Sequence, residues 1–336
     1  MSASERTRPI TNMAKVLEEV KKRSSGKSRK IVVSEMVEAL RERVRGQDHV
    51  LSDFAKLVRE SWGLAQRKQP VASILCLGPP GTGKSELAKA VAEYLYGDET
   101  HALVIDSTAL SGPEAKNHLI GNPLGYVGAE TGGKLTRPIL NNPRQVIVFE
   151  EIEKAYKEVF DLFLMMLGDG RLQEPGSGKW ADFTQSIVIL TGNAEHDAVA
   201  RISAQLSDPE EQSSAIKDHL VSAGVFRPEI MDRIDRVYVF QPLSEDILAE
   251  IALMKTENLA SDYGLEIVSL DEEILIDLVL RVMKFNKPNK VRELIRLVKK
   301  KLGEDFIEAK ETNFKRIVVS QDEDGEVRVV AATNAE

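Results

Sequence analysis

Short apolar runs alternate with amphipathic stretches over the first two thirds of the chain, and this alternation predicts the fold. The apolar runs have the length of buried strands, and the stretches between them repeat apolar residues at helical spacing. The strand-like runs are SILCL (73–77), ALVID (102–106), QVIVFEE (145–151) and SIVIL (186–190). Strands that alternate with helices favour a parallel sheet covered on both faces, so the sequence predicts an α/β fold.

The helical stretches divide the chain into parts. A helical pattern begins after Ile31 with SEMVEALRERV, is broken at GQDHV and continues to about Arg67. Further helical patterns occur at ELAKAVAEYLYG, GKLTRPILNN and YKEVFDLFLMML, and beyond residue 241 helices precede two short strands, RIVVS and EVRVV. The predicted parts are a basic flexible tail (1–30), a large α/β domain (31–240) and a smaller, mainly helical domain (241–336).

The charge distribution separates the tail from the rest of the chain. Residues 1–30 hold nine Lys/Arg against three Glu, whereas the whole chain has a net charge of −8. The remainder therefore lies near −14, and an acidic body argues against nucleic acid as a partner because phosphate contacts need basic surface. Within the tail Ile10, Met13, Leu17 and Val20 share one helical face, so a helix that docks a partner or adaptor is the alternative to a mobile tail.

Composition indicates a globular protein of the cytoplasm. The chain has 336 residues, 42% hydrophobic and 29% charged, which is ordinary for a globular protein with two cores. The single cysteine, Cys76, lies inside an apolar run and is predicted to be structural. No apolar run approaches the ~20 residues that cross a bilayer, so no membrane is expected.

The residues after the first strand predict a phosphate-binding loop. Gly78, Gly83, Lys84 and Ser85 match G-x-x-x-x-G-K-[ST], with a strand before and a helix after. In such a loop backbone N–H groups and the helix N-terminus face phosphate oxygens, the lysine reaches the terminal phosphates and the hydroxyl can ligate Mg²⁺. A simple tight turn is the alternative. The predicted ATP-binding residues of this loop are Gly78, Pro79, Pro80, Gly81, Thr82, Gly83, Lys84, Ser85 and Glu86.

Two adjacent carboxylates end the third strand. Glu150 and Glu151 follow four apolar residues, and buried carboxylates at a strand end are costly unless a cation or water lies nearby. In phosphate-loop enzymes one such carboxylate supports Mg²⁺ and its neighbour orients the attacking water. We therefore expect Ser85 to ligate Mg²⁺ and Glu150 to support the same ion through water. Glu151 is expected to be catalytic.

Five blocks together give the chain a family resemblance. They are GPPGTGKSELAKAVAEYL, IGNPLGYVGAETGGKLT, EEIEKAYKEVFDLFLMMLGDGRL, FRPEIMDRIDRVYVFQPL and the closing helical region. From about Val33 to Val330 the chain resembles the second, C-terminal ATPase module of the Clp/ClpB-type AAA+ unfoldases. The resemblance implies an AAA+ P-loop module with a small helical lid domain, ATP and Mg²⁺ as cofactors, and a ring, usually a homo-hexamer, that pulls protein substrates through a central pore.

The resemblance also implies roles for individual residues. Asn193, in LTGNA, falls on the sensor that hydrogen-bonds the γ-phosphate or the water. Arg233, in MDRID, falls on the arginine finger that completes the next subunit's site, and Arg227 is the weaker competitor. Tyr126 and Val127, in GYVG, fall on the pore loop, and a second loop at 172–183 would also face the channel. Without the surrounding blocks, a capping asparagine, a surface arginine and a locally packed aromatic would be the simpler interpretations.

The chain departs from the family pattern at three points. Glu150 stands where the family usually has Asp, and Lys287, in FNKPNK, stands where the family has an ATP-contacting arginine. The chain also shows no large N-terminal substrate domain, no first ATPase module and no Ile-Gly-Phe-like tripeptide within 197–222, so a ClpP-type peptidase partner is not expected.

These departures keep a second function open. The leading hypothesis is an ATP-driven remodeller that threads or disassembles proteins; the alternative is a nucleotide-controlled assembly factor or switch with slow hydrolysis and no threading. A motor that acts on nucleic acid has only the basic tail in its favour.

The side-chain length of Glu150 generates a first prediction. One extra methylene moves the carboxylate about 1.5 Å further into the Mg²⁺ shell than an aspartate. We expect Glu150→Asp to raise Mg²⁺-dependent ATP turnover about threefold or more, measured by steady-state phosphate release. Glu150→Gln, which removes the charge, serves as the control and should lower turnover; a decrease with Glu150→Asp would contradict the account.

Overall fold

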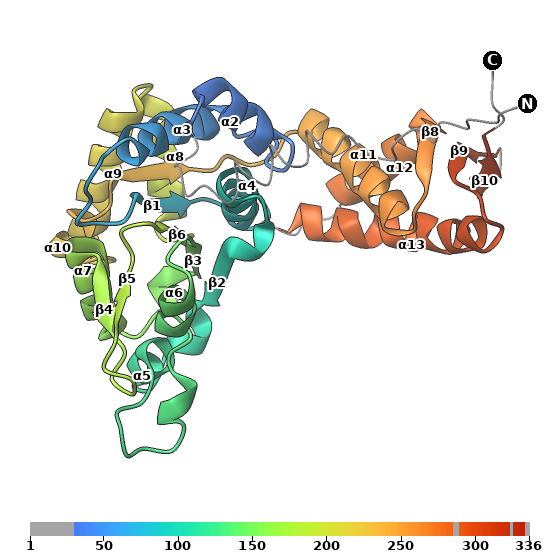
Figure 1. The fold of residues 1–336 in the computed structure, drawn as a ribbon. Coiled ribbons are helices and arrows are strands. Elements are labelled where there is room, and N and C mark those ends of the chain that lie inside the picture. Colours follow the sequence, from blue (N-terminus) through green and yellow to red (C-terminus); the bar gives the residue numbers. More distant parts are fainter. Residues whose placement is uncertain (1–29, 285–288, 323–324, 333–336) are drawn as a thin grey trace, which may run out of the picture.

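The computed structural model describes residues 30–284, 289–322 and 325–332, which form two lobes (Figure 1). We call residues 31–240 the large lobe and residues 245–332 the small lobe. The predicted tail, apart from its last residue, lies outside the described residues. Residues 241–244 join the two lobes.

A five-stranded parallel sheet forms the centre of the large lobe. The strand order is β2-β3-β6-β1-β7, and every neighbouring pair is parallel. Residues of β1 and β6 are buried throughout, as expected for strands covered on both faces. The four predicted strands are confirmed, and β7 was not predicted. The bounds are β1 Ala72–Leu77, β2 Ala102–Asp106, β3 Val146–Glu150, β6 Ile187–Gly192 and β7 Arg236–Val239.

Helices cover both faces of this sheet, because successive strand residues point to opposite sides. Ile74 and Val148 pack with α2 (Val33–Arg41), α3 (Asp48–Trp62) and α4 (Lys84–Tyr96). Leu75 and Phe149 pack on the other face, with α5 to α10. The bounds there are α5 Ala115–Ile120, α6 Thr136–Asn141, α7 Val159–Asp169, α8 His196–Gln205, α9 Pro209–Ser222 and α10 Pro228–Met231.

One predicted helix ends early. The helix predicted to reach about Arg67 ends at Trp62, with Gly63 as its C-cap. The Arg67 guanidinium donates to the carbonyl oxygens of Ser61 and Trp62 at 3.2 and 3.3 Å. A basic side chain thus satisfies carbonyls that another helical turn would have bonded.

The small lobe has its own core. It contains α11 (Glu245–Asp262), α12 (Glu272–Met283) and α13 (Lys290–Glu311), which pack around residues such as Leu248, Leu278 and Phe306. The predicted final strands are confirmed as β9 (Arg316–Gln321) and β10 (Val327–Ala331). An unpredicted strand, β8 (Glu266–Leu270), pairs with β9 in parallel.

The segment between the lobes is fixed at its large-lobe end. The buried Gln47 side chain donates to the Gln241 carbonyl at 2.9 Å and accepts from the Gln241 N–H at 3.0 Å. Phe240 extends β7 by donating its N–H to the Leu77 carbonyl at 2.8 Å. The small lobe therefore begins next to the loop that follows β1.

Among the residues that the structure describes, no helix has the length and apolar character to cross a membrane. Cys76 is fully buried in β1, and burial raises the pKa of its thiol to about 12. The buried thiol agrees with the structural role that the sequence predicts for Cys76.

Candidate functional site

The loop between β1 and α4 has the backbone that its glycines allow. Gly78, Gly81 and Gly83 have φ of 138°, 80° and 103°, a region that other residues adopt only with strain. A Cβ atom on Gly78 would lie 2.3 Å from the carbonyl oxygen of Phe240, so no other residue fits there. The loop then leads directly into the N-terminus of α4 at Lys84.

Lys84 faces the interior of this loop. Its ammonium group donates to the carbonyl oxygens of Gly78 and Pro79, both at 2.7 Å. Burial lowers the pKa of Lys84 below its ordinary value, while the charges of Glu153, Glu151 and Glu150 act in the opposite direction. A cation and the N-terminal N–H groups of a 13-residue helix thus converge on the loop, as an anionic ligand requires.

Ser85 and Glu150 meet across the sheet. β1 and β3 both flank β6, and parallel strands end at the same edge, so the residue after the loop lies opposite the last residue of β3. The Ser85 hydroxyl donates to Oε1 of Glu150. A hydroxyl and a carboxylate are the oxygen ligands that Mg²⁺ prefers.

A hydroxyl and one carboxylate fit Mg²⁺ that is bound together with a nucleotide. Within the described residues, no group of three or more His, Cys, Asp or Glu side chains could hold a metal ion. Mg²⁺ usually keeps one or two protein ligands and takes the rest from phosphates and water. Ser85 and Glu150 would supply the protein ligands, and Mg²⁺ would neutralise phosphate charge when bound.

Glu151 occupies a strained backbone position. Its φ is 52° and ψ is 50°, in the left-handed region that costs a non-glycine residue about 1–2 kcal/mol. This turn directs the chain away from the sheet immediately after Glu150. The exposed Glu151 carboxylate pairs with Lys154 at 2.5 Å. The two adjacent glutamates therefore point to different places, one toward Ser85 and one toward solvent.

Glu153 also lies at this edge of the sheet, although it was not predicted from the sequence. Its Oε1 atom accepts the backbone N–H of Asn193 at 3.0 Å. Its Oε2 atom is buried and has no hydrogen-bond partner among the described residues. A Cβ on Gly192 would lie 2.6 Å from that oxygen, so the glycine admits the carboxylate. The available signal was the third acidic residue of EEIEK, three positions after Glu150.

Asn193 follows β6 directly, at the same sheet edge as the loop and the glutamates. Its side chain is exposed, and its backbone is held by Glu153. The structure thus brings Lys84, Ser85, Glu150 and Asn193 to one edge of the sheet.

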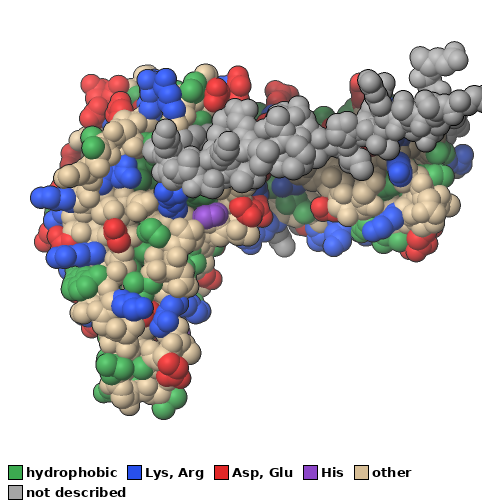
Figure 2. Space-filling view, in the orientation of Figure 1, with side chains coloured by type: hydrophobic (Ala, Val, Ile, Leu, Met, Phe, Trp, Pro, Cys, Tyr) green, Lys and Arg blue, Asp and Glu red, His purple; other side chains and the backbone are tan. Residues whose placement is uncertain are grey.

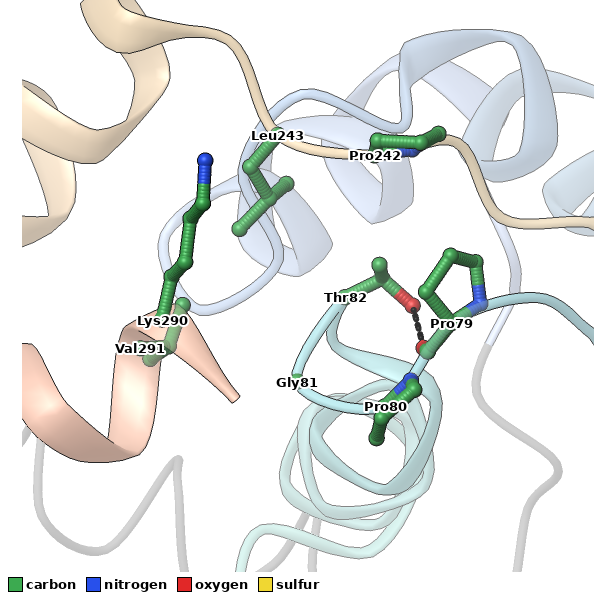
Figure 3. A pocket seen from close by; sticks show the side chains of 8 residues that line it. All are labelled: Pro79, Pro80, Gly81, Thr82, Pro242, Leu243, Lys290 and Val291. Atoms are coloured by element: carbon green, nitrogen blue, oxygen red, sulfur yellow. Dashed lines mark hydrogen bonds between the residues drawn. The ribbon is translucent and has the colours of Figure 1, made fainter. Parts of the chain in front are cut away.

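A pocket of about 190 Å³ continues from the loop toward the small lobe (Figure 3). Pro79, Pro80, Gly81 and Thr82 form one wall, and the hydroxyl of Thr82 donates to the Pro79 carbonyl at 2.9 Å. The facing wall consists of Pro242, Leu243, Lys290 and Val291. Lys287, predicted to contact ATP, lies outside the described residues.

The two candidate arginine fingers have different surroundings. Arg227, at the N-cap of α10, pairs with Asp161 of α7 at 2.7 Å. Arg233 is exposed, and its guanidinium has no hydrogen bond or ion pair with any residue in the described part of the chain. It lies over Gly168, where a Cβ would come within 2.5 Å of one of its terminal nitrogens. One terminal nitrogen of Arg227 is thus engaged by Asp161, whereas the Arg233 guanidinium has no such partner among the described residues.

Tyr126 lies in a loop, residues 121–133, that projects from the end of the large lobe away from the small lobe (Figure 1). We call it the Tyr126 loop. The side chains of Leu124, Tyr126 and Val127 are 76%, 70% and 97% exposed. Figure 2 shows hydrophobic side chains at the end of this projection. Such exposed apolar groups are typical of a surface that contacts another protein.

The predicted second loop at 172–183 is largely a hairpin. It contains the antiparallel strands β4 (Arg171–Gln173) and β5 (Trp180–Asp182), with a turn at 174–179. Leu172 and Ala181 are buried and anchor it, while Trp180 is 49% exposed. The turn packs against the base of the Tyr126 loop, so the two predicted substrate-contacting segments are neighbours.

Comparisons with known proteins agree with this geometry. A family model described as AAA domain (Cdc48 subfamily) matches residues 69–237. The chain is 38% identical over 227 residues to the chaperone protein ClpB of Rhodopirellula baltica, an alignment that covers 67% of this chain and 25% of that protein.

Two further relatives extend the similarity. The chain is 35% identical over 315 residues to chaperone protein ClpB 1 of Synechococcus elongatus, covering 91% of this chain and 35% of the relative. It is 36% identical over 230 residues to the negative regulator of genetic competence ClpC/MecB of Bacillus subtilis, covering 67% and 28%. The chain therefore spans about a quarter to a third of the length of these relatives.

The contact between Glu153 and Asn193 generates a prediction. Glu153→Ala removes the acceptor that fixes the Asn193 backbone, and we expect nucleotide hydrolysis to fall about tenfold or more while nucleotide affinity stays within about threefold. Steady-state hydrolysis and titration with a fluorescent ATP analogue measure the two effects. Glu158→Ala, at an exposed glutamate of the same segment, is the matched control. Unchanged hydrolysis in Glu153→Ala would remove Glu153 from the site.

Proposed function

The chain belongs to the Clp-type AAA+ ATPases, and from this premise we propose that it is an ATP-driven protein remodeller that works as a ring. The observation that carries the proposal is the exposed apolar end of the Tyr126 loop, in a chain that also has a complete phosphate loop. A nucleotide switch without a protein substrate has no need for such a loop.

In this proposal ATP binds at the edge of the parallel sheet. The loop from Gly78 to Glu86 holds the phosphates, Lys84 faces the terminal ones, and Ser85 and Glu150 support Mg²⁺, which supplies charge neutralisation when bound. Glu151 orients the attacking water after release from Lys154, and Asn193 hydrogen-bonds the γ-phosphate or that water. Lys287 contacts ATP from the small lobe.

Arg233 acts on the nucleotide of a neighbouring subunit. Both arginines are exposed, but Arg233 has no ion pair within the described residues, whereas Arg227 pairs with Asp161, and this difference supports Arg233 for the role. A guanidinium brought across an interface stabilises charge on the transferred phosphoryl group. Hydrolysis then depends on assembly, for which a homo-hexamer is the proposed form.

Protein substrates are gripped by Tyr126 and Val127. An aromatic ring with a polar tip buries area against many side chains without a sequence code. Residues 1–30 are the proposed place for an adaptor, and the cytoplasm is the proposed compartment.

The second candidate is a slow nucleotide switch that controls assembly without threading. The hydrogen bond between Ser85 and Glu150 favours this slow switch. The Glu150 carboxylate, on a longer side chain than the family's usual aspartate, already occupies the hydroxyl that a phosphate-bound Mg²⁺ would need. The two experiments below separate the candidates.

Mixing two inactive variants tests the shared site. Glu151→Gln keeps Arg233 but lacks the residue that orients water, and Arg233→Ala keeps Glu151 but lacks the finger. Each alone should hydrolyse ATP at under about 5% of the wild-type rate, and an equimolar mixture should recover up to about a quarter of it, since a site works when its neighbour supplies the arginine.

Arg227→Ala should keep most activity and serves as the matched control. Electron microscopy of Glu151→Gln with ATP should show rings. If the mixture stays inactive although rings form, Arg233 does not act across the interface.

Replacing Tyr126 tests threading. Tyr126→Ala removes the ring, so we expect unfolding of a fluorescent protein with an unstructured tail to fall about tenfold or more while ATP hydrolysis stays within about twofold. Fluorescence loss and phosphate release measure both activities. Tyr126→Phe, which keeps the ring, should retain unfolding. Normal hydrolysis without unfolding by the wild-type protein would favour the switch.

A further inference from the structure

Glu174 is a fully buried carboxylate at the start of the β4–β5 turn, outside the nucleotide site. Its Oε1 atom accepts hydrogen bonds from the Gly133 N–H at 3.3 Å, from Thr136 Oγ1 at 3.2 Å and from Arg137 Nε at 3.2 Å. Its Oε2 atom accepts from Ser177 Oγ at 2.6 Å and lies 3.0 Å from a terminal nitrogen of Arg137. Glu174 thus joins the hairpin to a segment that lies 37 to 41 residues earlier.

The charge of Glu174 makes this connection specific. Burial by itself raises the pKa of Glu174, but hydrogen bonds from Ser177 and Gly133 and the charge of Arg137 outweigh burial and lower the pKa below its ordinary value. The carboxylate is therefore ionised at neutral pH. An ionised group inside a protein requires its donors in place, whereas an apolar side chain would tolerate small shifts of its neighbours.

Backbones also touch at this point. A Cβ on Gly176, in the hairpin turn, would lie 2.3 Å from the Ala129 carbonyl oxygen and 3.0 Å from that of Asn122. A Cβ on Gly132 would lie 2.4 Å from Glu174 Oε1. At Gly176 the hairpin turn therefore contacts the backbone of the Tyr126 loop directly.

The base of the Tyr126 loop is held while its end is free. A Cβ on Gly121 would lie 3.0 Å from backbone atoms of Gly132 and Gly133, so the two ends of the loop touch. Glu174 holds the same end of the loop through the Gly133 N–H. The exposed side chains at the other end make their contacts with solvent. Any displacement of the hairpin turn must therefore move the loop that carries Tyr126.

The hairpin in turn continues the segment that starts at the nucleotide site. After Glu151 the chain runs through η4 (Ile152–Lys154), which contains Glu153, and enters α7. Strand β4 follows α7 after Gly170. Arg233 lies against Gly168, close to the C-terminus of α7. Glu174 is therefore placed where a shift of α7 reaches the Tyr126 loop.

We infer that Glu174 is a positioning residue that makes the hairpin turn (174–179) and the Tyr126 loop (121–133) move as one body. Its consequence rests on the proposed function: when α7 moves, the loop that grips the substrate moves with it. Nucleotide hydrolysis itself does not require the contact.

Hydrogen–deuterium exchange of the full-length chain with ATP tests the contact directly. Glu174→Gln keeps the volume but places an amide N–H₂ among donors. We expect amides of both segments to exchange at least about fivefold faster, with the rest of the large lobe unchanged. Thr136→Val, which removes one donor at nearly constant volume, should give the same pattern more weakly and carries the test if Glu174→Gln does not fold. Gln173→Ala removes a bond inside the hairpin, from its side chain to the Gly178 carbonyl, and is the matched control.

Activity measurements on the same variants separate positioning from stability. Glu174→Gln should keep ATP hydrolysis within about twofold and lose unfolding of the tailed fluorescent protein by about tenfold or more, whereas a merely structural role would lower both in proportion. Unchanged exchange in the two segments, or a proportional loss of both activities, would overturn the inference. If the wild-type protein unfolds no substrate, the proposed function fails, and the exchange pattern alone still decides whether Glu174 joins the two segments.

Discussion

Parallel strands all end at one edge of their sheet, and this constraint organises the large lobe. It brings Ser85 into contact with Glu150. β1, β3 and β6 deliver the phosphate loop, the glutamates and Asn193 to that edge, although 40 to 65 residues separate the paired groups along the chain. The linker to the small lobe leaves from the same edge, because β7 pairs with β1 and Phe240 extends that pairing. A nucleotide bound there would contact both lobes through the pocket between them.

Three glutamates within four residues have three different surroundings. Glu150 completes β3 and meets a hydroxyl, Glu151 turns outward through a left-handed backbone, and Glu153 folds back to hold the residue after β6. Backbone strain at Glu151 separates the directions of the first two side chains. The same short segment thus supplies a carboxylate that meets Ser85, an exposed carboxylate and a partly buried one, and it leads into α7.

From the C-terminal end of α7 onward, the structure joins distant segments through close contacts. Arg233 lies on Gly168, the hairpin turn lies on the Tyr126 loop, and Glu174 requires donors from both sides of that junction. Close-packed interfaces of this kind shift between discrete arrangements rather than deforming continuously. The stretch of chain from Glu151 through α7 to the hairpin turn runs from the edge that carries the phosphate loop to the contact with the Tyr126 loop.

The sequence by itself determined the phosphate loop, the four central strands and the mainly helical end, because glycine spacing and apolar periodicity are local signals. It did not predict β7 or β8, which are short and lie between stronger helical patterns, and it extended α3 past the point where Arg67 caps the helix. Only the tertiary structure placed Glu153 beside Asn193 and Glu174 beside the Tyr126 loop, and only it paired Arg227 with Asp161 while leaving Arg233 without an ion pair among the described residues. Each of these depends on a hydrogen bond or ion pair, formed or missing, between residues dozens of positions apart, and such pairs leave no periodic trace in one sequence. Lys287 lies outside the described residues, so its proposed contact with ATP stays a prediction.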